Sequence, residues 1–182
     1  MRAKLIASGI ILILALGGGV LFSSQSQHIT STASSAMATP AFSWQDFDGK
    51  SHDLSEFTGQ AVILHFWASW CVPCRAEFPK LLDAAKTVGK KVTFLVISSD
   101  ADHTKALRFI QQMEATAKVK KLSNVFYAWD PKKLITYDIF QTALYPESIA
   151  LDPAHEMRRK FSGPVMWDSP EIVDYLQTLA GP

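Results

Sequence analysis

The amino-acid sequence predicts an α/β fold in which helices cover both faces of a mixed central sheet. Two short apolar runs, 61–68 and 92–99, have the pattern of strands that are buried on both sides. An amphipathic stretch follows each run, as in parallel βαβ units. Near the end of the chain, two strand-like segments precede a last amphipathic helix. The expected order is therefore βαβα followed by ββα, which requires a mixed sheet.

Turn and cap residues place the first elements of this fold. The folded part is expected to begin near Phe42, and the residues after it alternate around Asp48-Gly49, a strong hairpin signal. After the first apolar strand, a helix is expected over 71–88, with Gly89 as the residue that ends it.

The second half of the chain completes the predicted sheet and its cover. Apolar residues at helical spacing predict a helix over 102–118. Ser169 is a favoured N-cap and Pro170 a favoured first helical residue, so the last helix is expected to run from there to Leu179. The remaining expected elements are a strand at 125–129, a short helix from Pro131 to Tyr137, and strands at 148–152 and 157–163 on either side of Asp152-Pro153.

Length and charge limit what the chain can be. Its 182 residues, of which 48% are apolar, are enough for one ordinary domain with a buried core. The net charge is +1, from 18 basic and 17 acidic residues. A nearly neutral domain lacks the basic surface that nucleic-acid binding needs, so no nucleic-acid partner is expected.

The first 22 residues have the composition of a membrane anchor. Arg2 and Lys4 precede an uncharged run over 5–22, whose eighteen residues would span about 27 Å as a helix. We expect a single transmembrane segment at 1–22. The alternative is a signal peptide that is cleaved near the small residues of 34–38.

Between this segment and the folded part lies a stretch without charge. Residues 23–41 include nine Ser or Thr, a composition that cannot bury enough apolar area to order itself. The predicted organisation is therefore an anchor at 1–22, a flexible linker at 23–41 and one domain at 42–182.

Both cysteines of the chain lie in the stretch WASWCVPCRAEFP, two residues apart. A structural disulfide over so short a loop would add only about 2 kcal/mol. Two thiolates supply half of a zinc site, although copper(I) can be held by two alone. The start of a helix instead favours a thiolate at Cys71. We expect an exposed Cys71 to attack and a shielded Cys74 to resolve the mixed disulfide, with copper(I) binding as the alternative.

The segment FWASWCVPCRAEFP resembles the active-site stretch of thioredoxin-fold proteins. It is most similar to that of the membrane-anchored periplasmic thiol-disulfide oxidoreductases of the TlpA, ResA and CcmG/DsbE types. The resemblance is expected to cover residues 42–180. It implies a thioredoxin-like fold behind one transmembrane helix. It also implies a redox-active Cys71–Cys74 disulfide, with no other cofactor and no metal.

The same resemblance implies a substrate-binding surface around the sulfurs. Pro146 occupies the place of the family's cis-proline, which faces the dithiol and leaves the preceding backbone free to pair with an extended substrate. Tyr145 is larger than the residue that the family usually has there. Trp70, Val72 and Pro73 complete the predicted surface.

Two further residues are candidates for moving protons. Glu77 lies one helical turn after Cys74 and could exchange a proton with it; the alternative is a solvated helix glutamate. His65 lies in the buried strand, where thioredoxins have an acid, and could accept the Cys74 proton near neutral pH. The alternative for His65 is a core histidine bonded to the backbone.

The function expected from these features is reduction of protein disulfides outside the cytoplasm. The family resemblance implies a periplasmic domain on a single-pass inner-membrane anchor, or a secreted protein if the N-terminal segment is cleaved. It also implies electrons from a transmembrane thiol donor, and substrates such as apocytochrome c during cytochrome c maturation or a copper-site assembly protein. The alternatives are a copper(I)-binding assembly chaperone and an oxidant that donates disulfides.

Overall fold

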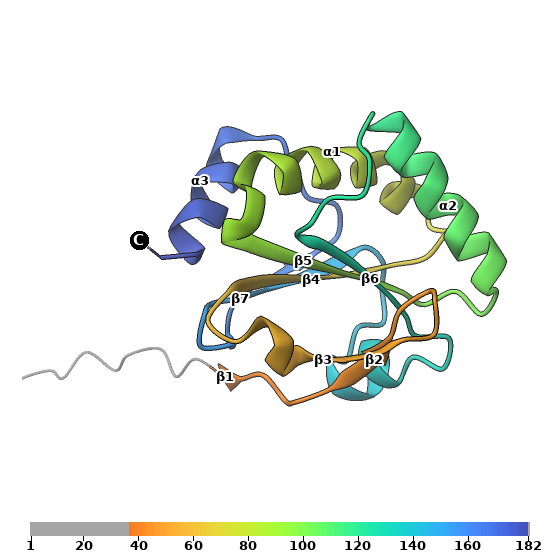
Figure 1. Ribbon diagram of the computed structural model, residues 1–182, viewed down its shortest axis with the longest axis horizontal. Coiled ribbons are helices and arrows are strands. Elements are labelled where there is room, and N and C mark those ends of the chain that lie inside the picture. The colour runs from red at the N-terminus through yellow and green to blue at the C-terminus, as the bar shows by residue number, and fades with distance from the viewer. Residues whose placement is uncertain (1–36, 182) are drawn as a thin grey trace, which may run out of the picture. The chain divides into compact units, whose positions relative to one another are not determined.

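The computed structural model of the protein describes residues 37–181 (Figure 1). The predicted anchor at 1–22 and most of the predicted linker therefore lie outside the described residues. Over 37–181, no helix combines the length and the apolar character needed to cross a membrane.

The centre of the structure is an eight-stranded mixed sheet with the order β1-β8-β7-β4-β5-β6-β2-β3. β4 pairs in parallel with β5, and β5 with β6, whereas the other neighbours are antiparallel. β4 and β5 are buried along their whole length, as their apolar sequences predict. The strands are β1 (Met37–Ala38), β2 (Ser43–Gln45), β3 (Ser51–Asp53), β4 (Ala61–Trp67), β5 (Val92–Ser98), β6 (Val125–Trp129), β7 (Glu147–Leu151) and β8 (Glu156–Ser162).

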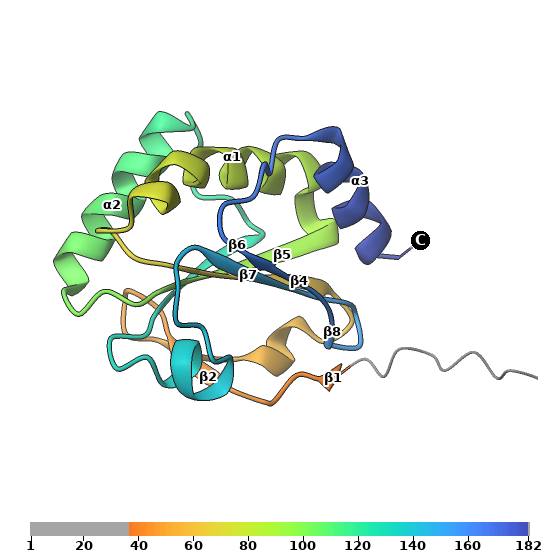
Figure 2. The same ribbon diagram turned by 180° about the vertical axis from the view of Figure 1, so that it is seen from behind.

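The three α-helices of the described chain lie together on one face of the sheet (Figures 1 and 2). The opposite face carries only short helical segments, so the predicted cover on both faces is uneven. The α-helices are α1 (Val72–Val88), α2 (His103–Thr116) and α3 (Pro170–Leu179); the short segments are η1 (Leu54–Phe57), η2 (Gly89–Lys91) and η3 (Leu134–Ile139).

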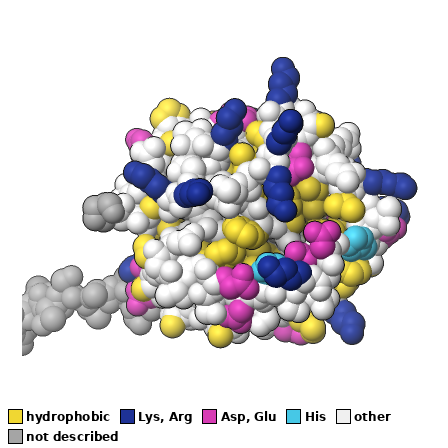
Figure 3. All heavy atoms as spheres, viewed as in Figure 1, with side chains coloured by type: hydrophobic (Ala, Val, Ile, Leu, Met, Phe, Trp, Pro, Cys, Tyr) yellow, Lys and Arg dark blue, Asp and Glu magenta, His cyan; other side chains and the backbone are white. Residues whose placement is uncertain are grey.

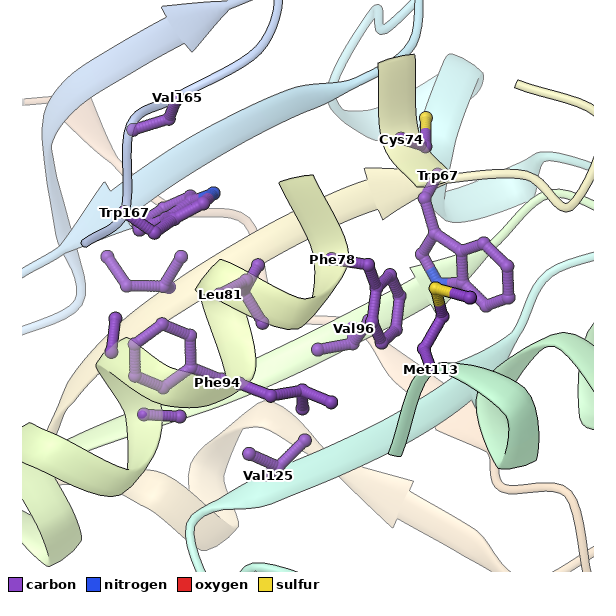
Figure 4. Close-up of a cluster of buried hydrophobic side chains, with 14 of the residues drawn as sticks. Trp67, Cys74, Phe78, Leu81, Phe94, Val96, Met113, Val125, Val165 and Trp167 are labelled. Carbon is purple, nitrogen blue, oxygen red and sulfur yellow. The ribbon is translucent and has the colours of Figure 1, made fainter. Parts of the chain in front are cut away.

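Each face of the sheet has its own apolar core. The larger core packs α1, α2 and α3 against the sheet and contains Trp67, Phe78 and Trp167 (Figure 4). The smaller core lies on the other face and contains Phe66 and Phe140, with residues of β2, η1 and η3. β4 contributes alternate side chains to both cores, which fixes its position in the middle of the molecule.

The predicted start of one helix is wrong. The short helix expected from Pro131 to Tyr137 begins later, as the π-helical segment η3. The carboxylate of Asp130 accepts the backbone N–H groups of the first residues of η3 and so fixes where it starts. The other predicted helices and strands agree with the structure to within one or two residues.

The folded chain also begins earlier than Phe42. Met37 and Ala38 form β1, which pairs with the start of β8. The N–H of Thr39 donates to the carbonyl of His155 at 3.1 Å. The end of the predicted linker is therefore an edge strand of the sheet.

The surface carries both signs of charge. Lys and Arg side chains share the face seen in Figure 3 with Asp, Glu and apolar side chains. Some form exposed ion pairs, such as Lys80 with Asp168 at 3.1 Å. This mixture agrees with the net charge of +1.

Candidate active site

The dithiol lies where β4 passes into α1. Cys71 is the N-cap of α1, and its sulfur accepts the backbone N–H of Cys74 at 3.2 Å. The two sulfurs form a disulfide. Free backbone N–H groups at a helix start stabilise negative charge. The same N–H that contacts the Cys71 sulfur in the disulfide would therefore stabilise the Cys71 thiolate after reduction.

The expected exposure of Cys71 is wrong for the disulfide form. Cys71 is 5% exposed and Cys74 is fully buried, so Cys71 is the more accessible sulfur by a small margin. The side chains around it project instead: Trp70 is 63% exposed, Val72 is 75% exposed, and Pro73 is also exposed. A substrate would therefore meet these three side chains before the sulfur.

The peptide bond between Tyr145 and Pro146 is cis, as predicted. β7 begins directly after it and runs antiparallel to β4, with Glu147 opposite Phe66. The start of β7 and the end of β4 therefore lie at the same edge of the sheet. The rings of Trp70 and Tyr145 meet there edge to face, with their centroids 5.6 Å apart. The register and this contact bring the dithiol loop and the proline loop together.

A groove beside Pro146 could receive a substrate chain. Its walls include Leu144, Tyr145 and Gly163. The carbonyl of Pro146 is already used, since it accepts the N–H of Gly163 at 3.0 Å. The backbone N–H and C=O of Tyr145 have no hydrogen-bond partner within residues 37–181. These two groups are the ones that the predicted strand-like pairing with a substrate requires.

A buried carboxylate holds the loop ahead of the dithiol. Asp100 accepts the backbone N–H of Ser69 at 2.8 Å and its hydroxyl at 2.7 Å. The hydroxyl of Ser98 donates to the same carboxylate at 2.9 Å. Asp100 is a functional residue that was not predicted from the sequence. It lies just after β5, beside the end of the parallel strand β4, and an acidic residue at this place in the sequence could have indicated a role near the dithiol loop.

Glu77 is buried against the segment that precedes α3. It is 3% exposed, and its Oε2 accepts the backbone N–H of Val165 at 2.6 Å. Burial raises the pKa of Glu77 from 4.5 to about 7, although the hydrogen bond from the N–H of Val165 and the nearby indole of Trp167 act in the opposite direction. The alternative of a solvated helix glutamate is therefore wrong.

His65 is completely buried, and both ring nitrogens face side chains. Nδ1 lies 2.8 Å from the hydroxyl of Ser148, and Nε2 lies 3.5 Å from Oε1 of Glu77. Burial lowers the pKa of His65 from 6.5 to about 3. The expectation of a base that is active alone near neutral pH does not fit this environment. The alternative of a core histidine is confirmed, but its hydrogen-bond partner is the Ser148 side chain on β7 and not the backbone.

Within residues 37–181, no three His, Cys, Asp or Glu side chains are grouped closely enough to hold a metal ion. Cys74, in the first turn of α1, and Trp67, at the end of β4, belong to the same apolar core (Figure 4). The reactive groups are thus two sulfurs at a helix start, with a buried acid one turn behind them. This arrangement suits exchange between thiols and disulfides.

Comparison with known proteins agrees with this chemistry. The family model described as Redoxin matches residues 33–176. The chain is 30% identical over 147 residues to the thioredoxin-like protein YneN of Bacillus subtilis strain 168, which covers 80% of this chain and 82% of that protein. It is 27% identical over 117 residues to the thiol-disulfide oxidoreductase ResA of Bacillus thuringiensis subsp. konkukian, over 63% of this chain and 68% of ResA.

A solved structure supports the same assignment. The crystal structure of a putative thiol:disulfide interchange protein DsbE from Chlorobium tepidum is 25% identical and superposes with a TM-score of 0.67. The match covers 80% of this chain and 97% of that one. With its helix-capping Cys71–Cys74 pair and its cis-proline before β7, the chain belongs to the Redoxin family and is a thiol-disulfide oxidoreductase of the ResA and DsbE type with a thioredoxin-like fold.

Proposed function

We propose that this protein reduces disulfides of exported proteins while it is anchored in the bacterial inner membrane with its domain in the periplasm. One observation supports disulfide exchange with protein substrates. The loop that carries the disulfide meets the loop with the cis Tyr145–Pro146 bond, and the backbone groups of Tyr145 have no partner within residues 37–181. The composition of residues 1–22, with Arg2 and Lys4 before an uncharged run, supports the anchor.

The reduced dithiol would pass two electrons to the substrate in two exchange steps. The Cys71 thiolate attacks one sulfur of the substrate disulfide, so the other substrate sulfur leaves as a thiolate. Cys74 then loses its proton and attacks the Cys71 sulfur of the mixed disulfide. This step releases the second substrate thiolate and forms the Cys71–Cys74 disulfide. A membrane thiol donor would return the two electrons by the same chemistry.

We assign substrate binding to the predicted surface residues around the two sulfurs. Trp70, Val72 and Pro73 offer an exposed, mostly apolar contact surface for the substrate. Tyr145 and Pro146 would hold the substrate chain in the groove. An apolar surface suits an unfolded or extended cysteine-containing segment, such as the haem-site cysteines of an apocytochrome c.

Glu77 would carry the proton that leaves Cys74. It shares the buried side of α1 with Cys74, one turn further along the helix. A carboxyl group with a pKa of about 7 can both take up and release a proton near neutral pH.

The substrate can be identified by trapping the intermediate. In the full-length Cys74→Ser variant, the second exchange step cannot occur, so the mixed disulfide at Cys71 should accumulate in cells. Non-reducing electrophoresis and mass spectrometry would name the partner. The Cys71→Ser variant is the matched control and should trap nothing. Equal trapping by both variants would rule out the proposed order of attack.

The two alternative functions give different results in vitro. A reductant turns over insulin disulfides when a thiol donor is supplied, and its own disulfide has a low reduction potential in glutathione buffers. A disulfide-donating oxidant instead equilibrates at a high potential. A copper(I) chaperone retains one metal ion per chain and shows no turnover.

Cell fractionation tests the location. The full-length protein should be found in the membrane fraction and be digested by protease added to spheroplasts. Recovery of an intact, protected chain from the cytoplasm would contradict the proposed location.

A further inference from the structure

Two buried polar atoms face each other behind the dithiol, and neither has another partner within residues 37–181. They are Nε2 of His65 and Oε1 of Glu77, 3.5 Å apart. His65 lies on β4 in the middle of the sheet, and Glu77 lies on α1 one turn after Cys74. A buried polar atom without a partner destabilises the fold, and two such atoms that face each other can relieve this cost by sharing a proton.

A proton placed between these two atoms would give each of them a partner. Without it, a lone pair of the carboxyl group would face a lone pair of the imidazole in a buried place, and two acceptors repel each other. Two arrangements of a neutral ring avoid this repulsion. Either Nε2–H of His65 donates to a charged Glu77, or the O–H of a protonated Glu77 donates to Nε2.

Ser148 allows both arrangements. Its hydroxyl lies 2.8 Å from Nδ1 of His65, and a hydroxyl can donate or accept. When the ring proton is on Nε2, the Ser148 hydroxyl donates to Nδ1. When the ring proton is on Nδ1, that N–H donates to the Ser148 oxygen. Each tautomer therefore keeps both hydrogen bonds of the ring.

We propose that His65 and Ser148 form a tautomer switch that keeps Glu77 hydrogen-bonded whether its carboxyl group is charged or protonated. When the unit takes up a proton, the Nε2 proton passes to Oε1 of Glu77 and the proton taken up resides on Nδ1. The ring stays neutral, and the Ser148 hydroxyl turns from donor to acceptor. His65 is a positioning residue in this scheme, because it acts through Glu77.

The use of the switch in catalysis rests on the proposed function. Cys74 must lose a proton before it attacks the mixed disulfide, and Glu77 is the nearest buried acid along the same helix side. A partner that can only donate a hydrogen bond would stabilise only the charged form of Glu77. A partner that can only accept one would stabilise only the protonated form. With the switch, the His65–Glu77 pair can take up the proton that Cys74 releases and return it by the reverse transfers, and Glu77 keeps a hydrogen bond in either state.

The surroundings of the pair contain few competing groups. α1 contributes Cys74, and β7 contributes Ser148. The segment before α3 contributes the N–H of Val165, 2.6 Å from Glu77 Oε2, and the indole of Trp167, whose ring centroid is 6.2 Å from that of His65. Over the part of the chain that the structure describes, His65 and Glu77 form no ion pair except with each other.

Nuclear magnetic resonance of the full-length disulfide form tests the switch directly. Ring ¹³C and ¹⁵N shifts distinguish the two tautomers, and loss of a signal in His65→Gln assigns the residue. We expect His65 to change from Nε2–H to Nδ1–H as the pH falls, at the same midpoint as the Glu77 carboxyl signal. In Ser148→Ala, one tautomer should persist. A single tautomer throughout the Glu77 titration of the wild-type protein would overturn the proposal.

This measurement needs no substrate, so it separates the inference from the proposed function. If the protein turns over no protein disulfide, the reductase proposal fails while the tautomer result still stands. If the reductase proposal holds and the tautomer is fixed, only the switch is wrong.

Kinetics test the role of His65 in the reaction. We expect His65→Leu to move the pH midpoint of mixed-disulfide resolution up by about one unit, which is about a tenfold loss of rate at a pH below the midpoint. His65→Gln has an amide that can donate and accept, so it should stay near the wild type. Thr93→Val is a control. It removes another buried strand hydroxyl, which donates to Gln60, and should leave the pH profile of mixed-disulfide resolution unchanged. Equal profiles for His65→Leu and His65→Gln would contradict the switch.

A double variant decides whether His65 acts through Glu77. In the Glu77→Gln background, His65→Leu should produce no further shift of the profile. A shift of the same size as in the wild-type background would mean that His65 acts independently, and the proposal would fail.

Discussion

Burial shifts the pKa values of His65 and Glu77 in opposite directions. Burial raises the pKa of Glu77 to about 7 and lowers that of His65 to about 3. Between about pH 4.5 and 6.5, the unfolded chain holds a proton on His65, whereas the folded chain holds one on Glu77. The numbers of bound protons then match, so this pair gives the wild-type protein little pH dependence of stability in that range.

Replacing either His65 or Glu77 should make the unfolding free energy depend on pH through the titration of the residue that remains. Glu77→Gln leaves His65, whose folded pKa is depressed, so stability present above about pH 6.5 is lost as the pH falls toward 3. His65→Gln leaves Glu77, whose folded pKa is raised, so stability present below pH 4.5 is lost as the pH rises through about 7, by about 3 kcal/mol. Urea unfolding from pH 4 to 8 measures both slopes, and parallel curves for the two variants would contradict the assignment.

Trp70 should affect substrate binding and leave stability unchanged. It is exposed beside Cys71, and its ring contacts that of Tyr145. We expect Trp70→Ala to raise KM for a protein disulfide several-fold, with a change of less than about 0.5 kcal/mol in unfolding free energy. Met37→Ala removes another exposed apolar side chain, on β1 at the far edge of the sheet, and serves as the control. An unchanged KM for Trp70→Ala would remove Trp70 from the binding surface.

At the scale of elements, the site depends on loops that are fixed by buried carboxylates. Asp100, after β5, holds the residue two positions before Cys71, and Asp130, after β6, holds the start of η3. Both aspartates follow parallel strands, whose carboxyl ends meet at one edge of the sheet. The geometry of the dithiol loop therefore depends on neighbouring strands as well as on its own sequence.

The loop should loosen when Asp100 is replaced. Asp100→Asn replaces one carboxylate oxygen with an amide nitrogen. This nitrogen cannot accept a hydrogen bond from Ser69 or Ser98. We expect a loss of about 2–3 kcal/mol in unfolding free energy, because a buried donor is left without a partner. Asp168→Asn, in the exposed pair with Lys80, should cost no more than about 1 kcal/mol. Equal losses for the two variants would show that Asp100 does not hold the loop.

At the scale of the whole molecule, the sheet separates two apolar cores, and a short strand covers one of its edges. β8 is covered by the two residues of β1, which come from the end of the predicted linker. An uncovered strand edge can pair with other chains. The segment that leads to the predicted anchor therefore also completes the sheet.

Weakening this edge should open β8 without unfolding the protein. Thr39→Pro removes the N–H that donates to His155. We expect faster amide hydrogen exchange at the start of β8 and a loss of about 1 kcal/mol or less in unfolding free energy. Ala41→Pro is the matched control, because the N–H of Ala41 has no partner within residues 37–181. If the two variants exchange alike, β1 does not protect β8.

Local signals made much of this molecule predictable. The buried strands and α1 follow from apolar runs and cap residues that act within a few positions of each other. The cis bond before Pro146 was predicted from family resemblance alone. The start of η3 was not predictable, because the side chain of Asp130 sets it. The uneven helical cover was also missed, since an amphipathic pattern does not say which face of the sheet a helix will bury.

The sequence by itself determined the α/β class, the position of the dithiol at the start of a helix and hence its chemistry, because each of these depends on neighbours along the chain. Only the tertiary structure decided that His65, Glu77 and Ser148 meet, and that Asp100 holds Ser69. The register of β4 against β7 places His65 opposite Ser148, although 83 positions separate them. Burial by the surrounding core then shifts the pKa values on which proton transfer depends, and neither register nor burial can be read from one residue and its neighbours.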